Sequence, residues 1–231
     1  MPTLTYATRR GELLQYFDRT AVDAWKRLTS DAPVNSIRAT VRAGRDEMRR
    51  TLLGWLPQDL HGVRLLDAGC GTGALAIEAA KKGANVVAID LSPTLVGLAQ
   101  ERLPHALGGG SIEFHVGDML NPDLGRFDYV VAMDSLIHYR PRDTVRVLEG
   151  LAERTDRSVL FTFAPRTPAL TVMHAVGRAF PRADRAPAIE PVRPASITRL
   201  IQSGMSNWTP RRTLRVSRGF YISQALEITR Q

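Results

Sequence analysis

The strongest constraint on the fold of this chain is an apolar run that passes directly into regularly spaced glycines. Residues 65–73 read Leu-Leu-Asp-Ala-Gly-Cys-Gly-Thr-Gly, and apolar residues at helical spacing follow over residues 74–82. A strand that turns through glycines into a helix is typical of an open α/β sheet, and the glycines let a bound ligand approach the backbone closely. The motif predicts an α/β fold with a ligand site at the end of this strand.

Downstream of the glycines, short apolar runs alternate with helical stretches as far as residue 163. Such alternation is typical of parallel strands joined by helices, and near-continuous apolar runs indicate strands that are buried on both faces. We expect strands over residues 63–66, 85–89, 111–116, 127–132 and 158–163, with helices over residues 74–82, 93–103 and 144–153.

The last third of the chain has a different pattern. Its expected elements are a helix over 169–180, a proline- and arginine-rich loop or lid over 181–194, a helix over 196–203, and strands over 208–216 and 220–228. Arg218 and Gly219 separate the two final strands. A short turn that contains glycine between two apolar runs predicts an antiparallel hairpin.

Two helices are expected before residue 61, over residues 11–29 and 37–55. We therefore divide the chain into an N-terminal helical segment, residues 1–60, which the family resemblance described below assigns to a substrate-binding lid, and a domain over residues 61–231 with a further lid insertion over about 166–194. One face of the second helix is strongly basic, with Arg38, Arg42, Arg45, Arg49 and Arg50.

Composition limits the size and location of the protein. The 231 residues suffice for one large domain with a small appendage, and 44% of them are hydrophobic. The single cysteine, Cys70, excludes an intramolecular disulfide framework and suits a reducing compartment. No apolar run reaches the roughly 20 residues that span a bilayer, and residues 1–10 lack the apolar core of a signal peptide. We expect a cytoplasmic protein that is at most peripheral to a membrane.

The net charge of +8 comes from 31 Lys and Arg residues against 23 Asp and Glu residues. This excess favours an anionic substrate, an acidic membrane surface or nucleic acid, and charge alone does not choose among them. A genome that favours arginine codons would produce the same excess.

The glycine pattern by itself fits two kinds of cofactor. Gly69, Gly71 and Ala74 satisfy the G-x-G-x-x-A pattern of dinucleotide-binding proteins. Three carboxylates at successive strand ends favour S-adenosylmethionine instead. Asp67 can face a ligand ammonium, and Asp90, 23 positions later, can accept both ribose hydroxyls. Asp118 can accept from an adenine amino group while Met119 packs on the ring.

In these features the sequence resembles the class I S-adenosylmethionine-dependent methyltransferases, over about residues 60–231. The resemblance implies a doubly wound, Rossmann-like seven-stranded sheet that ends in an antiparallel hairpin, behind the N-terminal helical lid. It also implies S-adenosylmethionine as the co-substrate. The expected cofactor-binding residues are Asp67, Gly69, Gly71, Gly73, Asp90, Leu91, Asp118, Met119, Asp134 and Arg42.

The residues after the fourth expected strand bear on the substrate, because they lie at the carboxyl end of the sheet. Asp134-Ser135-Leu136-Ile137 does not match the Asp/Asn-Pro-Pro-aromatic tetrad of enzymes that methylate amino groups of nucleic-acid bases. Cys70 belongs to the glycine loop, so it is not expected to attack a base. These two observations disfavour the common nucleic-acid methylation chemistries. His138 fits a general base, a metal ligand or a structural residue, and the sequence leaves these roles open.

A closer similarity runs nearly end to end. It is carried by the segments Tyr16–Thr20 with Trp25, Ile37–Gly44, Asp67–Gly73, Leu136–Tyr139, Phe161–Pro168 and Ser217–Tyr221. With these segments the sequence resembles the magnesium-protoporphyrin IX O-methyltransferase family. Arg19 departs from the family pattern, which has a small polar residue there. The resemblance implies methyl transfer from S-adenosylmethionine to a propionate of magnesium protoporphyrin IX, giving the monomethyl ester in bacteriochlorophyll biosynthesis. It implies Tyr16 and His138 as the catalytic, substrate-side residues.

Elementary chemistry is consistent with that reaction. A propionate has a pKa of about 4.3, like Glu, so it is already an anion at neutral pH and attacks a methyl group without a strong base. The resemblance also implies a partner, the large porphyrin-binding subunit of magnesium chelatase, and leaves open a contact with the photosynthetic membrane. No carboxylate or histidine cluster in the sequence predicts a metal site of the protein's own, so the metal would arrive within the substrate.

Two other functions remain open at this point. The first is O-methylation of another small apolar anion, such as a quinone-pathway intermediate. A phenolic acceptor would need deprotonation, so His138 would then be an essential base. The second is a cofactor-binding protein that uses its basic helix to hold nucleic acid or an anionic membrane, and steep salt dependence of that binding would identify it.

Overall fold

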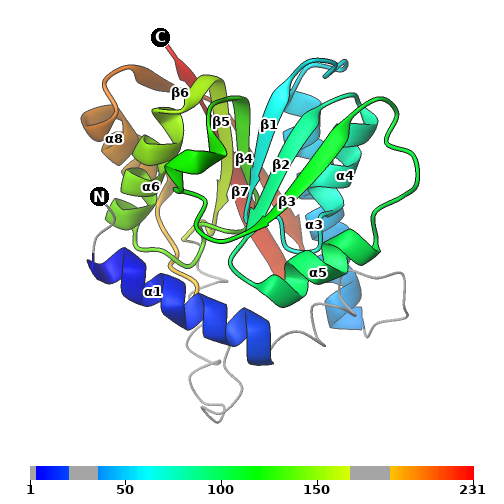
Figure 1. The fold of residues 1–231 in the computed structure, drawn as a ribbon. Helices are drawn as coiled ribbons and strands as arrows, with labels where there is room; N and C mark the ends of the chain where they lie inside the picture. The colour runs from blue at the N-terminus through cyan, green and yellow to red at the C-terminus, as the bar shows by residue number, and fades with distance from the viewer. Residues whose placement is uncertain (1–3, 21–35, 167–187) are drawn as a thin grey trace.

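The computed structural model describes residues 4–20, 36–166 and 188–231, and in these ranges it contains a seven-stranded sheet (Figure 1). The strands lie in the order β3-β2-β1-β4-β5-β7-β6. The first five pair in parallel, and β7 is antiparallel to both β5 and β6. This doubly wound sheet with an antiparallel end confirms the fold expected from the sequence.

The strands agree with the apolar runs to within a few residues. Their bounds are β1 Arg64–Ala68, β2 Asn85–Asp90, β3 Ser111–Val116, β4 Phe127–Ala132, β5 Thr155–Phe163, β6 Trp208–Arg218 and β7 Tyr221–Arg230. The last four residues of β1 and of β4 are buried, because helices cover both faces of the sheet there. The edge strand β3 alternates between exposed and half-buried positions instead.

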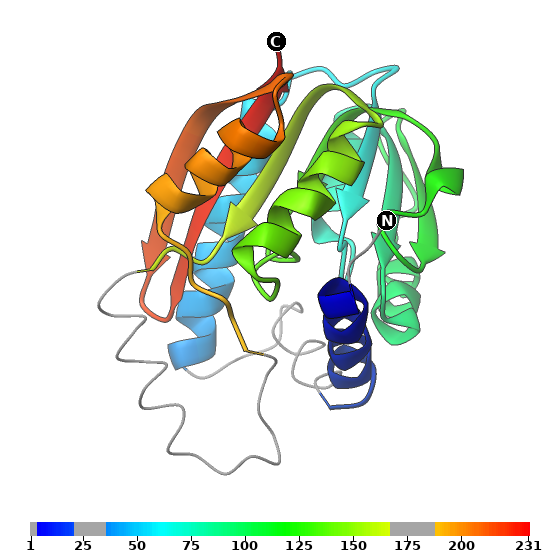
Figure 2. The ribbon, with the colours of Figure 1, turned by 90° about the vertical axis from the view of Figure 1, so that its left-hand side faces the viewer.

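Helices pack on both faces of the sheet and bury one hydrophobic cluster on each (Figure 2). On one face, α3 and α4 enclose residues such as Leu52, Leu65 and Ala79. On the other, α6 and α8 enclose residues such as Leu66, Leu148 and Ile201. The helix bounds are α3 Ser36–Trp55, α4 Ala74–Lys81, α5 Pro93–Glu101, α6 Pro141–Ala152 and α8 Pro194–Gly204, with a 3₁₀ turn, η2, at Pro122–Leu124.

The N-terminal helix α1, Leu4–Gln15, crosses the carboxyl ends of the strands (Figures 1 and 2). It continues into η1, a π-helical turn at Tyr16–Thr20. The expected start at residue 11 is therefore wrong, because helix forms from Leu4. The early turns are mostly polar, so helical periodicity does not reveal them, yet Tyr6 and Leu13 are both buried. The expected helix beyond residue 20 lies outside the described residues.

The second N-terminal helix, α3, belongs to the core that the sheet shares. Met48, Leu52 and Leu53 are buried in one cluster with residues of β1, α4 and β7. Gly44 of α3 also packs against Tyr221, the first residue of β7. Among the residues before 61, α3 thus covers one face of the sheet while α1 crosses its end. The domain division at residue 60 stays a prediction.

The hairpin between β6 and β7 turns at Gly219 and Phe220, one residue later than expected. Arg218 pairs with Tyr221, which leaves these two residues as the loop. Gly219 has a φ of 55°, and glycine with positive φ at the first loop position is what a tight type II′ hairpin requires. No helix among the described residues combines the length and apolar character needed to cross a membrane.

The described residues of the predicted lid insertion form backbone hydrogen bonds next to the carboxyl ends of β4 and β5. Val192 donates its N–H to the Ala164 carbonyl, and Arg166 donates to the Val192 carbonyl, both at 2.9 Å. Glu190 donates its N–H to the Ile137 carbonyl at 2.8 Å. The described residues on both sides of this insertion therefore lie at the ends of β4 and β5. The expected helix over 169–180 and the first half of the loop over 181–194 lie outside the described residues.

Candidate cofactor and substrate pocket

A pocket lies at the carboxyl ends of the parallel strands, where α1 and η1 cover it. The empty space between its walls is about 680 Å³, including the open mouth. Clefts of this size at the ends of parallel strands are the usual ligand sites of open α/β sheets. Its lining includes seven of the twelve predicted site residues, namely Gly69, Gly71, Asp90, Leu91, Met119, Asp134 and His138.

The three glycines of the loop all have positive φ, but they serve different purposes. At Gly69 an added Cβ would lie 2.3 Å from Cβ of Ser135, so glycine is needed for the loop to pack against the segment after β4. Gly73 precedes α4 at a φ of 78°, in the left-handed region. At Gly71 an added Cβ would meet no protein atom within 4 Å, and the residue lines the pocket. Gly71 is therefore where a ligand can come closest to the backbone.

Two carboxylates lie next to this loop, Asp90, which is half-buried, and Asp67, which is buried. Asp90 at the end of β2 accepts the Gly71 N–H at 2.9 Å and the Ser92 N–H at 3.0 Å, which fixes its side chain. Asp67 in β1 is 2% exposed, and its Oδ2 has no hydrogen-bond partner among the described residues. Burial, with the charge of Asp90 as a second cause, raises the pKa of Asp67 to about 7. An ionised Asp67 therefore requires a cation.

Cys70, between these glycines, is not a reactive thiol. Burial raises its pKa well above the usual value, so the thiol stays protonated at neutral pH. This agrees with the expectation that Cys70 does not act as a base-attacking thiol.

Asp118 lies outside the pocket lining, although the next residue, Met119, is part of it. Its carboxylate contacts α1: the Tyr6 hydroxyl donates to Oδ1 at 2.7 Å, and the Arg10 guanidinium forms an ion pair with Oδ2. Burial raises the pKa of Tyr6, which keeps that hydroxyl a donor. Tyr6 also stacks on Tyr139, with ring centroids 5.0 Å apart. Asp118 thus fastens α1 over the pocket, and its expected contact with the adenine stays a prediction.

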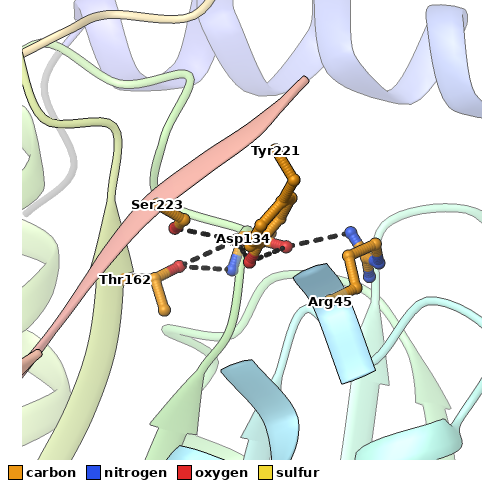
Figure 3. A network of polar contacts seen from close by, with 5 residues as sticks. All are labelled: Arg45, Asp134, Thr162, Tyr221 and Ser223. Atoms are coloured by element: carbon orange, nitrogen blue, oxygen red, sulfur yellow. Dashed lines mark hydrogen bonds and ion pairs between the residues drawn. The ribbon is translucent and has the colours of Figure 1, made fainter. Parts of the chain in front are cut away.

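Asp134 is the centre of a polar network that joins the segment after β4 to α3, β5 and β7 (Figure 3). Its carboxylate accepts from Tyr221 at 3.0 Å, Thr162 at 3.1 Å and Ser223 at 3.3 Å, and it forms an ion pair with Arg45 at 3.0 Å. The Asp134 N–H in turn donates to Thr162 Oγ1 at 2.7 Å. Asp134 is the one described non-glycine residue with positive φ, 55°. The network therefore holds a sharp change of chain direction after β4.

His138 reaches the pocket from the segment that follows this turn. It is 8% exposed, and its Nδ1 lies 3.4 Å from the Ala188 carbonyl oxygen, so Nδ1 donates in that contact. Phe17 of η1 meets the imidazole edge-on, with centroids 5.9 Å apart, and also lines the pocket. In the neutral ring this tautomer makes Nε2 an acceptor.

Five of the twelve predicted residues do not line the pocket, namely Asp67, Gly73, Asp118, Tyr16 and Arg42. Tyr16 packs its ring edge-on against Phe17 at 5.2 Å, and it is Phe17 that lines the cavity. On α3 it is likewise Arg45, not Arg42, that reaches the lining. One helical turn separates Arg42 from Arg45, and a basic helix face does not reveal which arginine points at a cavity. The catalytic and cofactor roles of Tyr16 and Arg42 stay predictions.

Comparisons with known proteins agree with this arrangement. The profile of the family "Magnesium-protoporphyrin IX methyltransferase C-terminus" matches residues 132–230, and a "Methyltransferase domain" profile matches residues 65–156. A magnesium-protoporphyrin O-methyltransferase from Rhodobacter capsulatus is 49% identical over 223 residues, which cover 96% of this chain and 97% of the relative. One from Synechocystis is 33% identical, covering 93% and 94%.

A solved structure has the same fold. The crystal structure of magnesium protoporphyrin IX methyltransferase from Synechocystis PCC 6803 with bound S-adenosylhomocysteine has a TM-score of 0.85 and 31% identity. The match covers 96% of this chain and 100% of that one. With a relative 49% identical over nearly the whole length of both proteins, the chain belongs to the magnesium-protoporphyrin O-methyltransferase family.

Proposed function

We propose that this protein transfers a methyl group from S-adenosylmethionine to a propionate carboxylate of magnesium protoporphyrin IX, giving the monomethyl ester. The observation that carries the proposal is that one pocket joins the glycine loop and Asp90 to His138 and Phe17. On this proposal the cofactor and an apolar, histidine-bearing wall for the substrate would share one cavity. The 49% identity to the Rhodobacter capsulatus enzyme supports the same substrate.

The residues present fit the co-substrate. S-adenosylmethionine supplies a methyl group on a cationic sulfonium, which an anionic oxygen attacks directly. Asp67 would hold the ammonium group, because its buried Oδ2 has no hydrogen-bond partner among the described residues. Asp90 would accept ribose hydroxyls, and Gly71 leaves room for close approach to the backbone. Met119, in the pocket lining, would pack on the adenine.

The main task of the protein is then alignment and exclusion of water. A propionate needs no base, and holding reacting groups in line is worth several kcal/mol. Phe17 and Leu13 of the N-terminal helices line the same cavity and keep it apolar. Since opposite charges cancel as the methyl group moves, a dry pocket favours the reaction.

We assign His138 a substrate-side role that depends on its protonation. With Nδ1–H donating to Ala188, the neutral ring presents Nε2 as an acceptor suited to the magnesium of the porphyrin. The imidazolium form would instead donate from Nε2 to a propionate. The two roles differ in their dependence on the metal, because only the first requires it.

A methyl-transfer assay tests both the identity of the substrate and the role of His138. Labelled S-adenosylmethionine is offered with magnesium protoporphyrin IX, metal-free protoporphyrin or a quinone-type phenol. We expect label on the porphyrin only. Label on the phenol alone would contradict the substrate and favour the ubiquinone-type alternative, whose Xanthomonas relatives are 37% identical over half of this chain. If His138→Ala slows the magnesium form and spares the metal-free form, the histidine binds the metal. An equal loss with both favours orientation of the carboxylate.

We also propose that the substrate arrives from the large porphyrin-binding subunit of magnesium chelatase, because a bare macrocycle is poorly soluble. A surface that suits such a contact lies at the tip of the β6–β7 hairpin. Phe220 and Ile37 are about half exposed, and the Phe220 N–H donates to Thr40 Oγ1 of α3 at 3.4 Å. Exposed apolar side chains at one tip suit a partner or a membrane surface. Phe220→Ser should weaken capture by the purified subunit if the partner docks there, and binding to anionic vesicles if a membrane does.

A further inference from the structure

The chain crosses from β3 to β4 without a long helix. Between the other parallel strands of the described range 36–166, the connection contains α4, α5 or α6, which have eight to twelve residues. Residues 117–126, here called the crossover segment, contain the three-residue turn η2 instead. A helix bonds most of its own carbonyl groups. The carbonyl groups of the crossover segment therefore need donors from elsewhere in the protein.

Arg154 supplies two of these donors. It is half-buried and lies between α6 and β5. Its Nη2 donates to the Met119 carbonyl at 2.8 Å, and its Nη1 donates to the Asn121 carbonyl at 2.7 Å. A guanidinium holds its donors in a rigid planar fork, and hydrogen bonds from a charged donor are stronger than neutral ones. One side chain thus fixes the spacing and direction of two carbonyl groups.

The two carbonyl groups belong to a tight turn at the start of the crossover segment. The Asp118 carboxylate accepts the Leu120 N–H at 3.0 Å, and the Asp118 carbonyl accepts the Asn121 N–H at 2.9 Å. Met119 lies within this turn, is 7% exposed and lines the co-substrate pocket. A peptide that turned away from Arg154 would also move the side chain of Met119. The clamp by Arg154 therefore sets where Met119 stands in the pocket wall.

Arg154 acts from outside this pocket. It is absent from the pocket lining and lines a separate groove instead, together with Asn121 and Glu153. Its backbone is fixed as well, because the Arg154 carbonyl accepts the Phe127 N–H at 2.9 Å where β4 begins. The guanidinium thus connects the crossover segment to the sheet.

We propose that Arg154 is a positioning residue for the co-substrate, which holds Met119 in place for contact with the adenine. The proposal rests on the proposed function for the identity of the co-substrate. Without Arg154, a bound ligand would itself have to order the turn at 118–121. Fixing the backbone of one residue corresponds to about 5- to 30-fold in an equilibrium constant. The loss of Arg154 should weaken every ligand that carries the adenine by that factor.

The test is equilibrium binding of S-adenosylhomocysteine, of 5′-methylthioadenosine, which lacks the amino-acid part, and of magnesium protoporphyrin IX. In Arg154→Gln we expect about 5- to 30-fold weaker binding of both adenine ligands and unchanged binding of the porphyrin. Unchanged affinity for S-adenosylhomocysteine would overturn the proposal. An equal loss for the porphyrin would show general damage to the pocket and would also overturn it.

Two further variants separate positioning from general stability. Arg154→Lys keeps the charge but not the planar fork, so its affinity for S-adenosylhomocysteine should lie between those of the unchanged protein and Arg154→Gln. If Arg154 acts through Met119, the double variant Arg154→Gln with Met119→Ala should bind S-adenosylhomocysteine no more weakly than Met119→Ala alone. Full additivity of the two losses would contradict that route. If Arg154→Gln does not fold, Arg154→Lys with the affinity of the unchanged protein would overturn the proposal.

Amide hydrogen exchange gives a local readout. The N–H groups of Leu120 and Asn121 should exchange faster in Arg154→Gln, because their partners belong to the released turn. Faster exchange at these two amides with unchanged affinity for S-adenosylhomocysteine would show that the clamp is purely structural, against the proposal.

Arg126→Gln is the matched control. The Arg126 guanidinium donates to the Glu153 carbonyl at 3.1 Å and forms an ion pair with Asp156. This substitution removes an arginine from the same junction but leaves both bonds of Arg154 to the turn, so ligand binding should be unchanged. None of these titrations needs turnover. A chain that binds S-adenosylhomocysteine with the help of Arg154 but never esterifies the porphyrin would refute the proposed function alone.

Discussion

Gly44 of α3 offers a direct test of how this helix docks on the sheet. The position is buried in the helix interior, where alanine is ordinarily more stable than glycine by about 1 kcal/mol. An added Cβ at Gly44 would lie 2.5 Å from Cδ1 of Tyr221 and 2.7 Å from its Cβ and Cγ. Rotating the ring does not relieve these overlaps, because Cβ is fixed to the backbone of β7. Either α3 or β7 must therefore move.

Whether Gly44→Ala stabilises or destabilises the protein depends on the gain in helix stability and the cost of overpacking. Overpacking a filled site costs about 1–3 kcal/mol, which equals or exceeds the helix gain. Gly54, on the same helix, has nothing within 4 Å of an added Cβ, so Gly54→Ala receives the gain without the overlap. We expect Gly44→Ala to be about 1–3 kcal/mol less stable than Gly54→Ala. For a chain of this size that is a difference in Tm of roughly 2–12 °C.

Urea unfolding of both variants and the unchanged protein measures this difference. Gly44→Ala should also weaken S-adenosylhomocysteine binding, because Tyr221 would move away from Asp134, which its hydroxyl reaches at 3.0 Å. If Gly44→Ala were as stable as Gly54→Ala, the docking of α3 against Tyr221 described above would be incorrect.

Four further predictions concern charge and hydrogen bonding. The affinity for S-adenosylhomocysteine should fall as the pH drops from 8 to 6, because Asp67, with a pKa of about 7, must be ionised to hold an ammonium. Without ligand, the same raised pKa lowers folding stability as the pH rises from about 4 to 7, since the native state keeps a proton that the unfolded chain has lost. Tyr6→Phe removes the 2.7 Å bond to Asp118 and should speed amide hydrogen exchange in α1. Arg212→Met should cost about 3 kcal/mol in urea unfolding, because it strips the buried Glu227 of its bidentate partner.

Each of these has its own control. The pH dependence of binding should flatten in Asp67→Asn, and an unchanged slope would exclude Asp67. Tyr16→Phe is the matched variant for the exchange measurement, and equal protection of α1 in both variants would contradict the role of Tyr6. Arg126→Met breaks an exposed ion pair with Asp156 and should cost less than about 1 kcal/mol.

The sequence predicted the sheet well because burial on both faces makes its central strands nearly all apolar. The glycine loop and the acidic residues at the strand ends could also be predicted, because each directly follows an apolar run. The start of α1 could not be predicted from local sequence, because the contacts that stabilise it are made with residues distant in sequence. Tyr6 reaches Asp118, and Thr5 donates to Asp143 at 3.0 Å, 138 positions away.

Contacts between residues distant in sequence also explain which features of the site could not be predicted. Asp134 was expected to bind the cofactor, but the hydroxyls of Thr162, Tyr221 and Ser223 that surround its carboxylate come from β5 and β7. No local pattern relates residues of one chain that are 28 to 89 positions apart. Arg45 likewise could not be told from the other arginines of α3 until the helix was docked.

The left-handed backbone of Asp134 also limits which residues can replace it in other members of the family. Asn and Gly are the other residues that readily adopt a φ of 55°, so few replacements are open at this position. Each of them would leave Arg45 beside a group without charge. Relatives that differ at position 134 should therefore differ at position 45 as well, and an aligned set of family sequences would show the two positions changing together.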